Sequence, residues 1–264
     1  MNHTNDAGLN KAASLLATAR NSVSRLDALP EDMRPQSVAE MYALQEKLVR
    51  ELGGRGGFKA GPAAPQMAPV TGMICAPLPK KNFVHSGTSV EVPAGGFVGV
   101  EAESAFKLGA DLPPPHKDYS EEEIDAAIES AVPLIEVLWS RFNDMKTAGV
   151  YCLIGDLQMH GCLVLGEAIE GWQNKSLDSL HVRVTINGAE VFNNPNAPHP
   201  AGRVLAPLMW LANDGARARG GLKAGEIVTC GSFCGAIPLK APAEVVASFP
   251  GLNKEIKVSY AAKS

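Results

Sequence analysis

The stretch VEAESAF, Val100 to Phe106, has the texture of a buried strand and yet carries two glutamates two residues apart. Side chains alternate between the two faces of a strand, so Glu101 and Glu103 point to one side, and the residues beside and between them point to the other. The two glutamates therefore face either water or a positively charged group.

Two capping boxes mark the starts of helices. Ser37 is followed three residues later by Glu40, which predicts a helix that ends at a pair of glycines. Ser120 and Glu123 form the second box, and apolar residues at helical spacing extend that helix to Ala131. Further helices are expected over residues 12–20 and about 204–219.

Most of the remaining chain has strand character. The dipeptide Asn187-Gly188 lies between two alternating stretches and predicts a hairpin, because it readily adopts two positive φ angles. The glycine- and proline-rich region 53–96 predicts loops and short strands. Other strands are expected over 132–139, 227–230, 245–249 and 256–260. The whole chain, 1–264, is thus predicted to be a single α+β domain, with helices outside the strands and a small helical N-terminal lobe up to about residue 55.

Composition excludes several functional classes. The 264 residues are 45% apolar and 20% charged, the formal net charge is −4, and no lysine or arginine run is present, which argues against nucleic acid as a partner. No apolar run reaches the roughly 18 to 20 residues of a membrane span, and the N-terminal residues lack a secretory signal, so we expect a cytoplasmic protein without a membrane partner. Five cysteines without a C-x-x-C pair indicate buried thiols.

Glu136 lies within the apolar stretch VPLIEVLW. Burying an ionised carboxylate without a partner costs several kcal/mol, so this residue should be protonated, ion-paired or metal-bound. If it meets Glu101 and Glu103, the three carboxylates form an oxygen site suited to Mg²⁺ or Mn²⁺. Two alternatives remain: a solvated glutamate face, and an ion pair with Arg141, which on a continuing strand points away from Glu136.

Several stretches along the chain together resemble the 2-keto-4-pentenoate hydratase and 4-oxalocrotonate decarboxylase branch of the fumarylacetoacetate hydrolase superfamily. They are AEMYALQ, GFKAG, VEAESAF, PLIEVLWSR, LVLG, LMWLAN, GLKAGEIVTCGSF and FPGLNKEIKVSY. The resemblance implies a mixed β-roll fold, a symmetric homo-oligomer, and a 2-oxo acid or 2-hydroxy-dienoate as the small-molecule substrate. It also implies that the divalent ion is held by Glu101, Glu103 and Glu136, and that Lys59 is the active-site lysine.

The resemblance implies hydration of a 2-hydroxy-dienoate in aromatic catabolism: C5 of the dienol is protonated, and water then adds at C4. Lys59 would position the substrate carboxylate or transfer a proton, with its pKa lowered by burial. Ser232 in CGSFCG and Arg141 in the WSR stretch are the predicted substrate-binding residues.

One departure from the branch concerns proton transfer. Pro77 stands about where related sequences have an acid, and we expect Asp156 and His160 to replace that acid or base. Two alternatives to hydration therefore stay open. One is decarboxylation of a 4-oxalocrotonate-like diacid, and the other is a non-catalytic paralogue that binds metal and an oxo acid.

Overall fold

Two long antiparallel strands, β5 (Val98–Leu108) and β6 (Ile128–Trp139), lie at the centre of the fold. Their register places Glu101 directly opposite Glu136, so the two acidic stretches become neighbours. The structure is a computed structural model that describes residues 5–263.

The strands form two mixed sheets. The first has eight strands in the order β2-β1-β10-β5-β6-β7-β3, with β11 paired to β5, and the second has five in the order β4-β13-β12-β8-β9. The strands not yet bounded are β1 (Arg55–Pro62), β2 (Met73–Pro79), β3 (Phe83–His85), β4 (Thr88–Pro93), β7 (His160–Leu165), β8 (Ser179–Ile186), β9 (Ala189–Pro198), β10 (Ile227–Ser232), β11 (Ile237–Pro238), β12 (Ala243–Phe249) and β13 (Lys254–Lys263). Both parallel and antiparallel pairs occur, as the predicted mixed β-roll requires.

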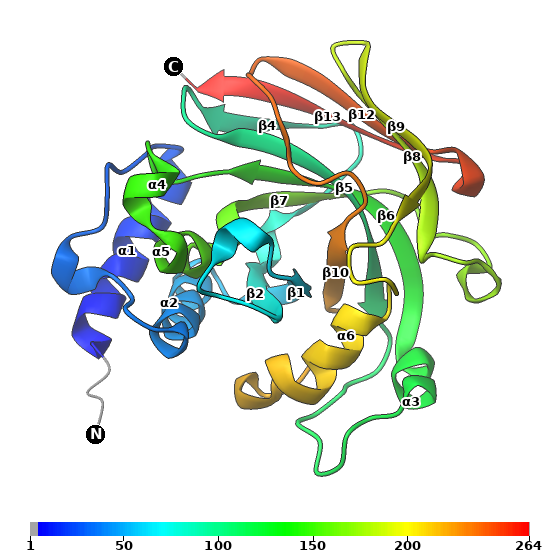
Figure 1. Cartoon of the computed structure of the whole chain (residues 1–264), viewed down its shortest axis with the longest axis horizontal. Helices are drawn as coiled ribbons and strands as arrows, with labels where there is room; N and C mark the ends of the chain where they lie inside the picture. Colours follow the sequence, from blue (N-terminus) through cyan, green and yellow to red (C-terminus); the bar gives the residue numbers. More distant parts are fainter. Residues whose placement is uncertain (1–4, 264) are drawn as a thin grey trace.

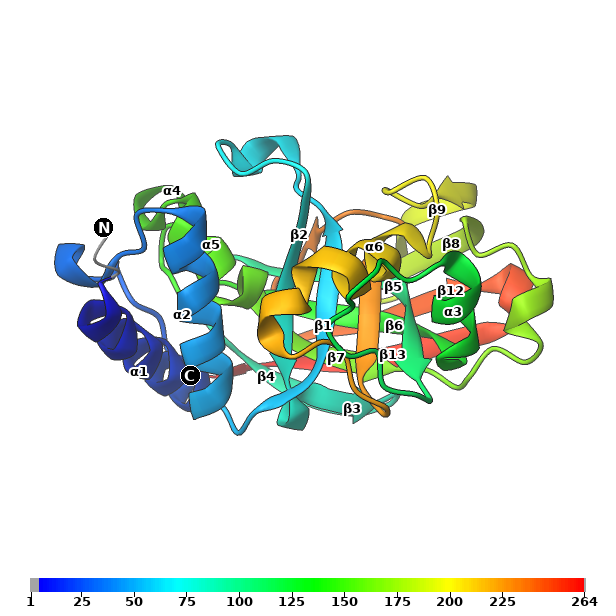
Figure 2. The same cartoon turned by 90° about the horizontal axis from the view of Figure 1, so that it is seen from below.

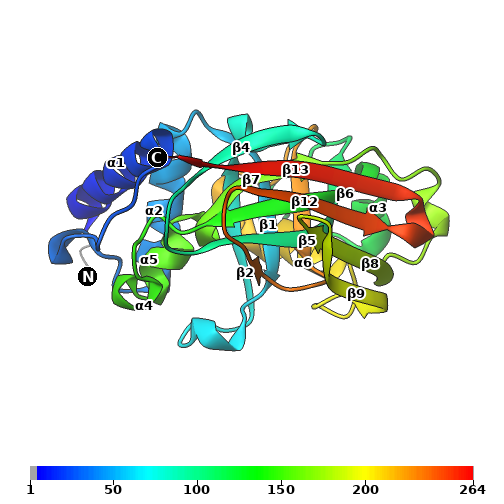
Figure 3. The ribbon, with the colours of Figure 1, turned by 90° about the horizontal axis from the view of Figure 1, so that it is seen from above.

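The second sheet covers one face of the first, and Figures 1 and 3 show β12 and β13 lying across β5 and β6. The alternate residues Ala102 and Val137 face this interface and share a core with Val245 and Val258. Tyr260 joins the two sheets by donating a hydrogen bond to the Gly99 carbonyl, with 3.2 Å between the oxygens. The glutamates consequently point to the opposite face of the first sheet.

Helices lie outside the sheets, both beside the N-terminus and at the opposite side of the molecule (Figure 1). The α-helices are α1 (Asp6–Ser22), α2 (Val38–Glu51), α3 (Glu121–Ala126), α4 (Met145–Ala148), α5 (Val150–Gly155) and α6 (Ala206–Trp210). Short 3₁₀ or π turns are η1 (Glu31–Met33), η2 (Pro65–Met67), η3 (Lys80–Asn82), η4 (Leu157–Met159), η5 (Trp172–Asn174), η6 (Leu211–Gly215), η7 (Arg217–Arg219) and η8 (Pro250–Leu252). Helices α1 and α2 form the predicted N-terminal lobe, whose first four residues lie outside the described range. Within residues 5–263, no helix combines the length and the hydropathy needed to cross a membrane.

Two predicted helices are wrong in extent. Helix α3 ends at Ala126, because Ile128 already pairs with Leu108 in the sheet. Apolar residues at helical spacing can also begin a buried strand, and pairing with β5 decides between the two. The helix expected over 204–219 is broken into α6, η6 and η7, with an i→i+5 hydrogen bond from the Ala216 N–H to the Leu211 carbonyl.

The predicted helix caps, hairpin turn and free thiols are confirmed. Ser37 caps α2 by accepting the N–H of Glu40, and Ser120 and Glu123 form the reciprocal capping box of α3. The hairpin between β8 and β9 turns at Asn187 and Gly188, whose φ angles are 52° and 80°. All five cysteines are free thiols, and four of them are buried.

Gly57 provides a test of the packing that holds β1 in the sheet. A Cβ atom at this position would lie 1.9 Å from the Ile227 carbonyl oxygen of β10, so Gly57→Ala forces backbone to move. We expect the free energy of unfolding in urea to fall by about 1–3 kcal/mol. Gly251→Ala is the control, because a Cβ there has no described heavy atom within 4 Å. Equal stability of the two variants would contradict this packing.

Candidate metal and substrate site

The structure brings three predicted residues together. Glu101 and Glu103 of β5 and Glu136 of β6 each offer a carboxylate oxygen, and these oxygens lie within 4.8 Å of one another. Glu136 is fully buried, Glu103 is 2% exposed and Glu101 is partly exposed. The solvated glutamate face, considered from the sequence, is therefore wrong.

Lys59 of β1 supplies the cation that faces these carboxylates. Its Nζ lies 2.8 and 2.7 Å from the two carboxylate oxygens of Glu136, and its side chain is 12% exposed. Burial alone would lower the pKa of Lys59, but the charges of the three carboxylates outweigh it and raise the pKa above its ordinary value. The expected lowering by burial is therefore wrong, and Lys59 is an ammonium at neutral pH.

The electrostatics of the cluster favour a divalent cation. Burial raises the pKa of Glu101 to about 7, and burial together with the neighbouring carboxylates raises the pKa of Glu103 well above its usual value. Three carboxylates against one ammonium leave a formal charge of −2 when all are ionised. A Mg²⁺ or Mn²⁺ ion would balance this charge, and an all-oxygen donor set suits either ion.

Buried neighbours orient two of the carboxylates. His160, at the start of β7, is fully buried, and its Nδ1 lies 2.8 Å from an oxygen of Glu136. Burial lowers the pKa of His160 to about 4, so the neutral ring must carry its proton on Nδ1 to donate this hydrogen bond. The buried Thr229 hydroxyl donates in the same way to Glu103. Such partners fix the direction of a metal ligand, and His160 is placed to orient Glu136 in this way.

A pocket of about 280 Å³ opens above Glu101 and Glu103. The β1–β2 connection, which projects from the body in Figure 2, contributes Gln66 and Met67 to its wall. Ser232, at the end of β10, also lines the pocket, as predicted for a substrate-binding residue. The other lining residues are Lys59, Ala60, Gly61, Pro62, Ala64, Ile74, Leu138, Gln158, Met159, Pro200, Gly231, Gly235 and Ala236.

The structure does not bring Asp156 and Arg141 into this pocket. Both side chains are fully buried, and Arg141 Nε lies 2.5 Å from an oxygen of Asp156. Arg20 of α1 binds the other oxygen of Asp156, at 3.2 Å from its Nε. Both oxygens of Asp156 are thus engaged by guanidiniums, and neither Asp156 nor Arg141 is among the described residues that line the pocket.

The two arginines form a clamp with Asp156 and the neighbouring backbone. Arg20 donates to the carbonyls of Asp156 and His160, with N–O distances of 2.9 and 2.8 Å. Arg141 donates to the same two carbonyls, at 3.1 and 3.0 Å. The clamp fixes the backbone that leads into His160, and it also ties the N-terminal lobe to the site.

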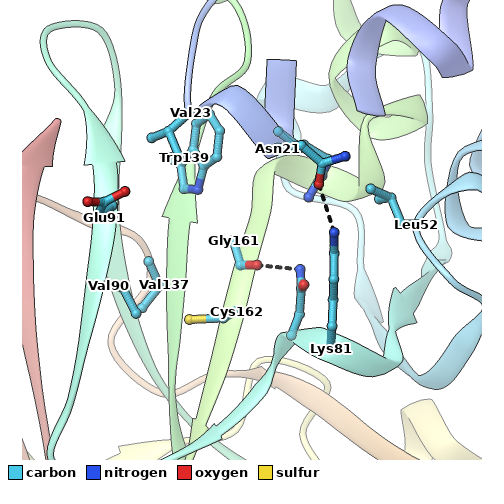
Figure 4. Close-up of a pocket in the computed structure, with 12 residues that line it drawn as sticks. Asn21, Val23, Leu52, Lys81, Val90, Glu91, Val137, Trp139, Gly161 and Cys162 are labelled. Atoms are coloured by element: carbon cyan, nitrogen blue, oxygen red, sulfur yellow. Dashed lines mark hydrogen bonds between the residues drawn. The ribbon is translucent and has the colours of Figure 1, made fainter. Parts of the chain in front are cut away.

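A second pocket, of about 230 Å³, lies on the side of β6 that carries Val137 and Trp139 (Figure 4). Two of its polar side chains are already engaged: Lys81 donates to Asn21 at 2.7 Å, and Asn82 donates to the Gly161 carbonyl at 2.6 Å. Because the carboxylate cluster is absent from the described residues that line it, the metal site is assigned to the other pocket.

Sequence reasoning missed three residues of the site: Arg20, Thr229 and Gln158. Thr229 lies in the GLKAGEIVTCGSF stretch, and its alternation with Gly231 along β10 was a usable signal. Arg20 and Gln158 carry no local signal, because their roles depend on contacts with distant segments. Pro77 stands about where related sequences have an acid. It is buried in β2 opposite Phe58, so this position supplies no acid to the pocket.

Comparison with known proteins indicates the class of protein that this chain resembles. No family model matches the chain. In sequence it is 27% identical over 241 residues to 2-hydroxyhexa-2,4-dienoate hydratase of Comamonas testosteroni, covering 86% of this chain and 88% of that protein.

Solved structures give the fold. The 4-oxalocrotonate decarboxylase from Pseudomonas putida G7, complexed with magnesium and adipate, has a TM-score of 0.81 at 21% identity, covering 96% of this chain and 97% of that one. The fumarylpyruvate hydrolase from Pseudomonas aeruginosa, in complex with Mn²⁺ and pyruvate, has a TM-score of 0.55 at 12% identity, covering 78% and 89%. The fold is that of the fumarylacetoacetate hydrolase superfamily. The resemblance to its hydratase and decarboxylase branch, indicated by the sequence motifs, is confirmed.

The arginine clamp predicts a large effect of one substitution. Asp156→Asn leaves two buried guanidiniums without their counter-charge, and we expect the free energy of unfolding to fall by about 3–5 kcal/mol. Asp111→Asn is the control, because its pair with Lys223 is about half exposed and is screened by solvent, so its loss is expected to change stability little. Urea denaturation measures both variants. A small loss in Asp156→Asn would show that the clamp is not required for folding.

Proposed function

We propose that this protein is a divalent-metal-dependent hydratase that adds water to a 2-hydroxy-dienoate, or to its 2-oxo-enoate tautomer, in the breakdown of aromatic compounds. The observation that carries the proposal is the carboxylate cluster with its surplus charge of −2 at the base of a pocket. The similarity to a curated dienoate hydratase over 86% of the chain supports the substrate class.

The proposed roles follow from the positions of the side chains. Glu101, Glu103 and Glu136 would hold a Mg²⁺ or Mn²⁺ ion, with His160 orienting Glu136. The ion would act as a Lewis acid toward the carboxylate and C2 oxygen of the substrate. Lys59, as an ammonium beside the cluster, is the proposed proton donor, and Ser232 is the proposed partner of the substrate carboxylate.

The lining of the pocket favours a substrate with one carboxylate. Among the described residues that line it, Lys59 is the one cationic side chain, and Glu136 already engages it. A diacid would bring a second carboxylate into a wall made mostly of apolar residues such as Ile74, Leu138 and Met159. Hydration of a monocarboxylate is therefore preferred over decarboxylation of a diacid.

Decarboxylation of a 4-oxalocrotonate-like diacid is the second candidate, supported by the TM-score of 0.81 with a decarboxylase. One assay separates the candidates. Loss of the dienol ultraviolet absorbance is followed in Mg²⁺ together with CO₂ release, with 2-hydroxypenta-2,4-dienoate and with the diacid as substrates. We expect the monoacid chromophore to disappear without CO₂. Release of CO₂ in step with turnover would establish decarboxylation, and ligand binding without any turnover would establish a non-catalytic paralogue.

Glu136→Gln tests the proposed metal ligands. This variant removes one carboxylate charge from the cluster, so we expect Mg²⁺-dependent binding of oxalate, measured by calorimetry, to be abolished. Glu129→Gln is a matched control on the same strand, because Glu129 is about half exposed and pairs with Lys107 at 2.7 Å. Unchanged affinity in Glu136→Gln, with the fold intact by circular dichroism, would refute the assignment of Glu136.

A further inference from the structure

The turn between α5 and β7 has an unusual backbone. Leu157, Gln158 and Met159 follow one another with φ angles of 52°, 54° and 61°. The left-handed region is unfavourable for residues that carry a Cβ, and it normally occurs at single positions. Three in succession persist only where the surrounding structure holds them, and such strain is concentrated at functional sites.

The arginine clamp holds this turn at both ends. Asp156 precedes the turn and His160 follows it, and Arg20 and Arg141 each donate to the carbonyls of both residues. The backbone of the turn is therefore held in place, which fixes the Cα–Cβ direction of its central residue.

That central side chain is Gln158, which lines the same pocket as Glu101 and Glu103. It is 9% exposed, and its Nε2 is buried without a hydrogen-bond partner among residues 5–263. A buried amide donor without a partner is costly, and most such groups in folded proteins are paired. A strained backbone that presents an unpaired donor to a pocket points to a ligand oxygen.

The register of the sheet indicates which part of a bound ligand lies near Gln158. Glu136 lies opposite Leu163 of β7, and the next residue on its face, Leu138, lies opposite His160. Gln158 precedes His160 by two residues and, like Leu138, lines the pocket. A ligand whose chelating end lies at Glu101 and Glu103 and whose chain extends along β6 toward Leu138 would reach this amide.

We propose that Gln158 is a specificity-determining residue whose terminal amide donates a hydrogen bond to the C4 hydroxyl of a 4-hydroxy-2-oxo acid, the hydrated product. This inference rests on the proposed function, because hydration is the reaction that creates an oxygen at C4. The amide distinguishes this product from a 2-oxo acid of the same length that lacks the hydroxyl.

A pair of matched ligands tests the proposal in the full-length protein with Mg²⁺. Calorimetry measures the affinities of 4-hydroxy-2-oxopentanoate and 2-oxopentanoate for the wild type, for Gln158→Met and for Gln173→Leu. Gln173 is exposed and lies outside the pocket, so Gln173→Leu is the control. We expect Gln158→Met to bind the hydroxy acid roughly tenfold more weakly and 2-oxopentanoate unchanged, as for the loss of one hydrogen bond.

The outcomes separate the two proposals. Equal weakening of both ligands in Gln158→Met, or no weakening of either, overturns the role of Gln158 while wild-type binding and turnover leave the hydratase standing. Failure of the wild type to bind either acid in Mg²⁺ overturns both. Gln158→Ala is the second variant: it also removes the donor, and the same selective loss is expected if Gln158→Met fails to fold.

Discussion

The buried charge between strands β5 and β6 is the constraint on which the rest of this structure depends. Glu103 and Glu136 lie in an interior where an isolated carboxylate is strongly destabilised, so positive charge must reach them. Lys59 extends from β1 to meet Glu136, and the remaining surplus of negative charge matches a divalent ion. The second sheet packs against the opposite face, where the alternating side chains are apolar. One face of a single pair of strands thus carries the proposed chemistry, while the other carries the core.

A second buried charge network, centred on Asp156, gives the site its geometry. The arginines that surround Asp156 come from α1 and from the segment after β6. They donate hydrogen bonds to backbone carbonyls on both sides of a left-handed turn. The N-terminal lobe therefore contributes to the pocket without lining it, because Arg20 holds the turn that presents Gln158. Buried networks in which every charged group is hydrogen-bonded specify one arrangement of the groups that they join, which is what a substrate-positioning turn requires.

The pocket joins two environments that suit a bifunctional ligand. Its base is anionic and would bind the chelating end of a 2-oxo acid through a metal, while its walls are largely apolar and accommodate a hydrocarbon chain. Gln158 and Ser232 are polar side chains in these walls. Ser232 ends β10, which pairs with β5, and Gln158 precedes β7, which pairs with β6. The contrast between base and walls is the physical reason that we propose a monocarboxylate substrate, even though the fold is similar to that of a 4-oxalocrotonate decarboxylase, with a TM-score of 0.81.

The amino-acid sequence by itself determined the features that depend on local chemistry: the shared face of Glu101 and Glu103, the helix caps at Ser37 and Ser120, and the Asn187-Gly188 turn. Together with the resemblance of its motifs, it also indicated the fold and the three clustered glutamates. Only the tertiary structure decided the partners of the buried charges. It paired Asp156 with two arginines, ended α3 early in favour of β6, and placed Gln158 in the lining of the pocket. Alternation and capping act within a few residues, whereas these outcomes depend on strand register and on contacts between separate segments, such as Arg20 with Asp156 at a separation of 136 residues, for which no local pattern exists.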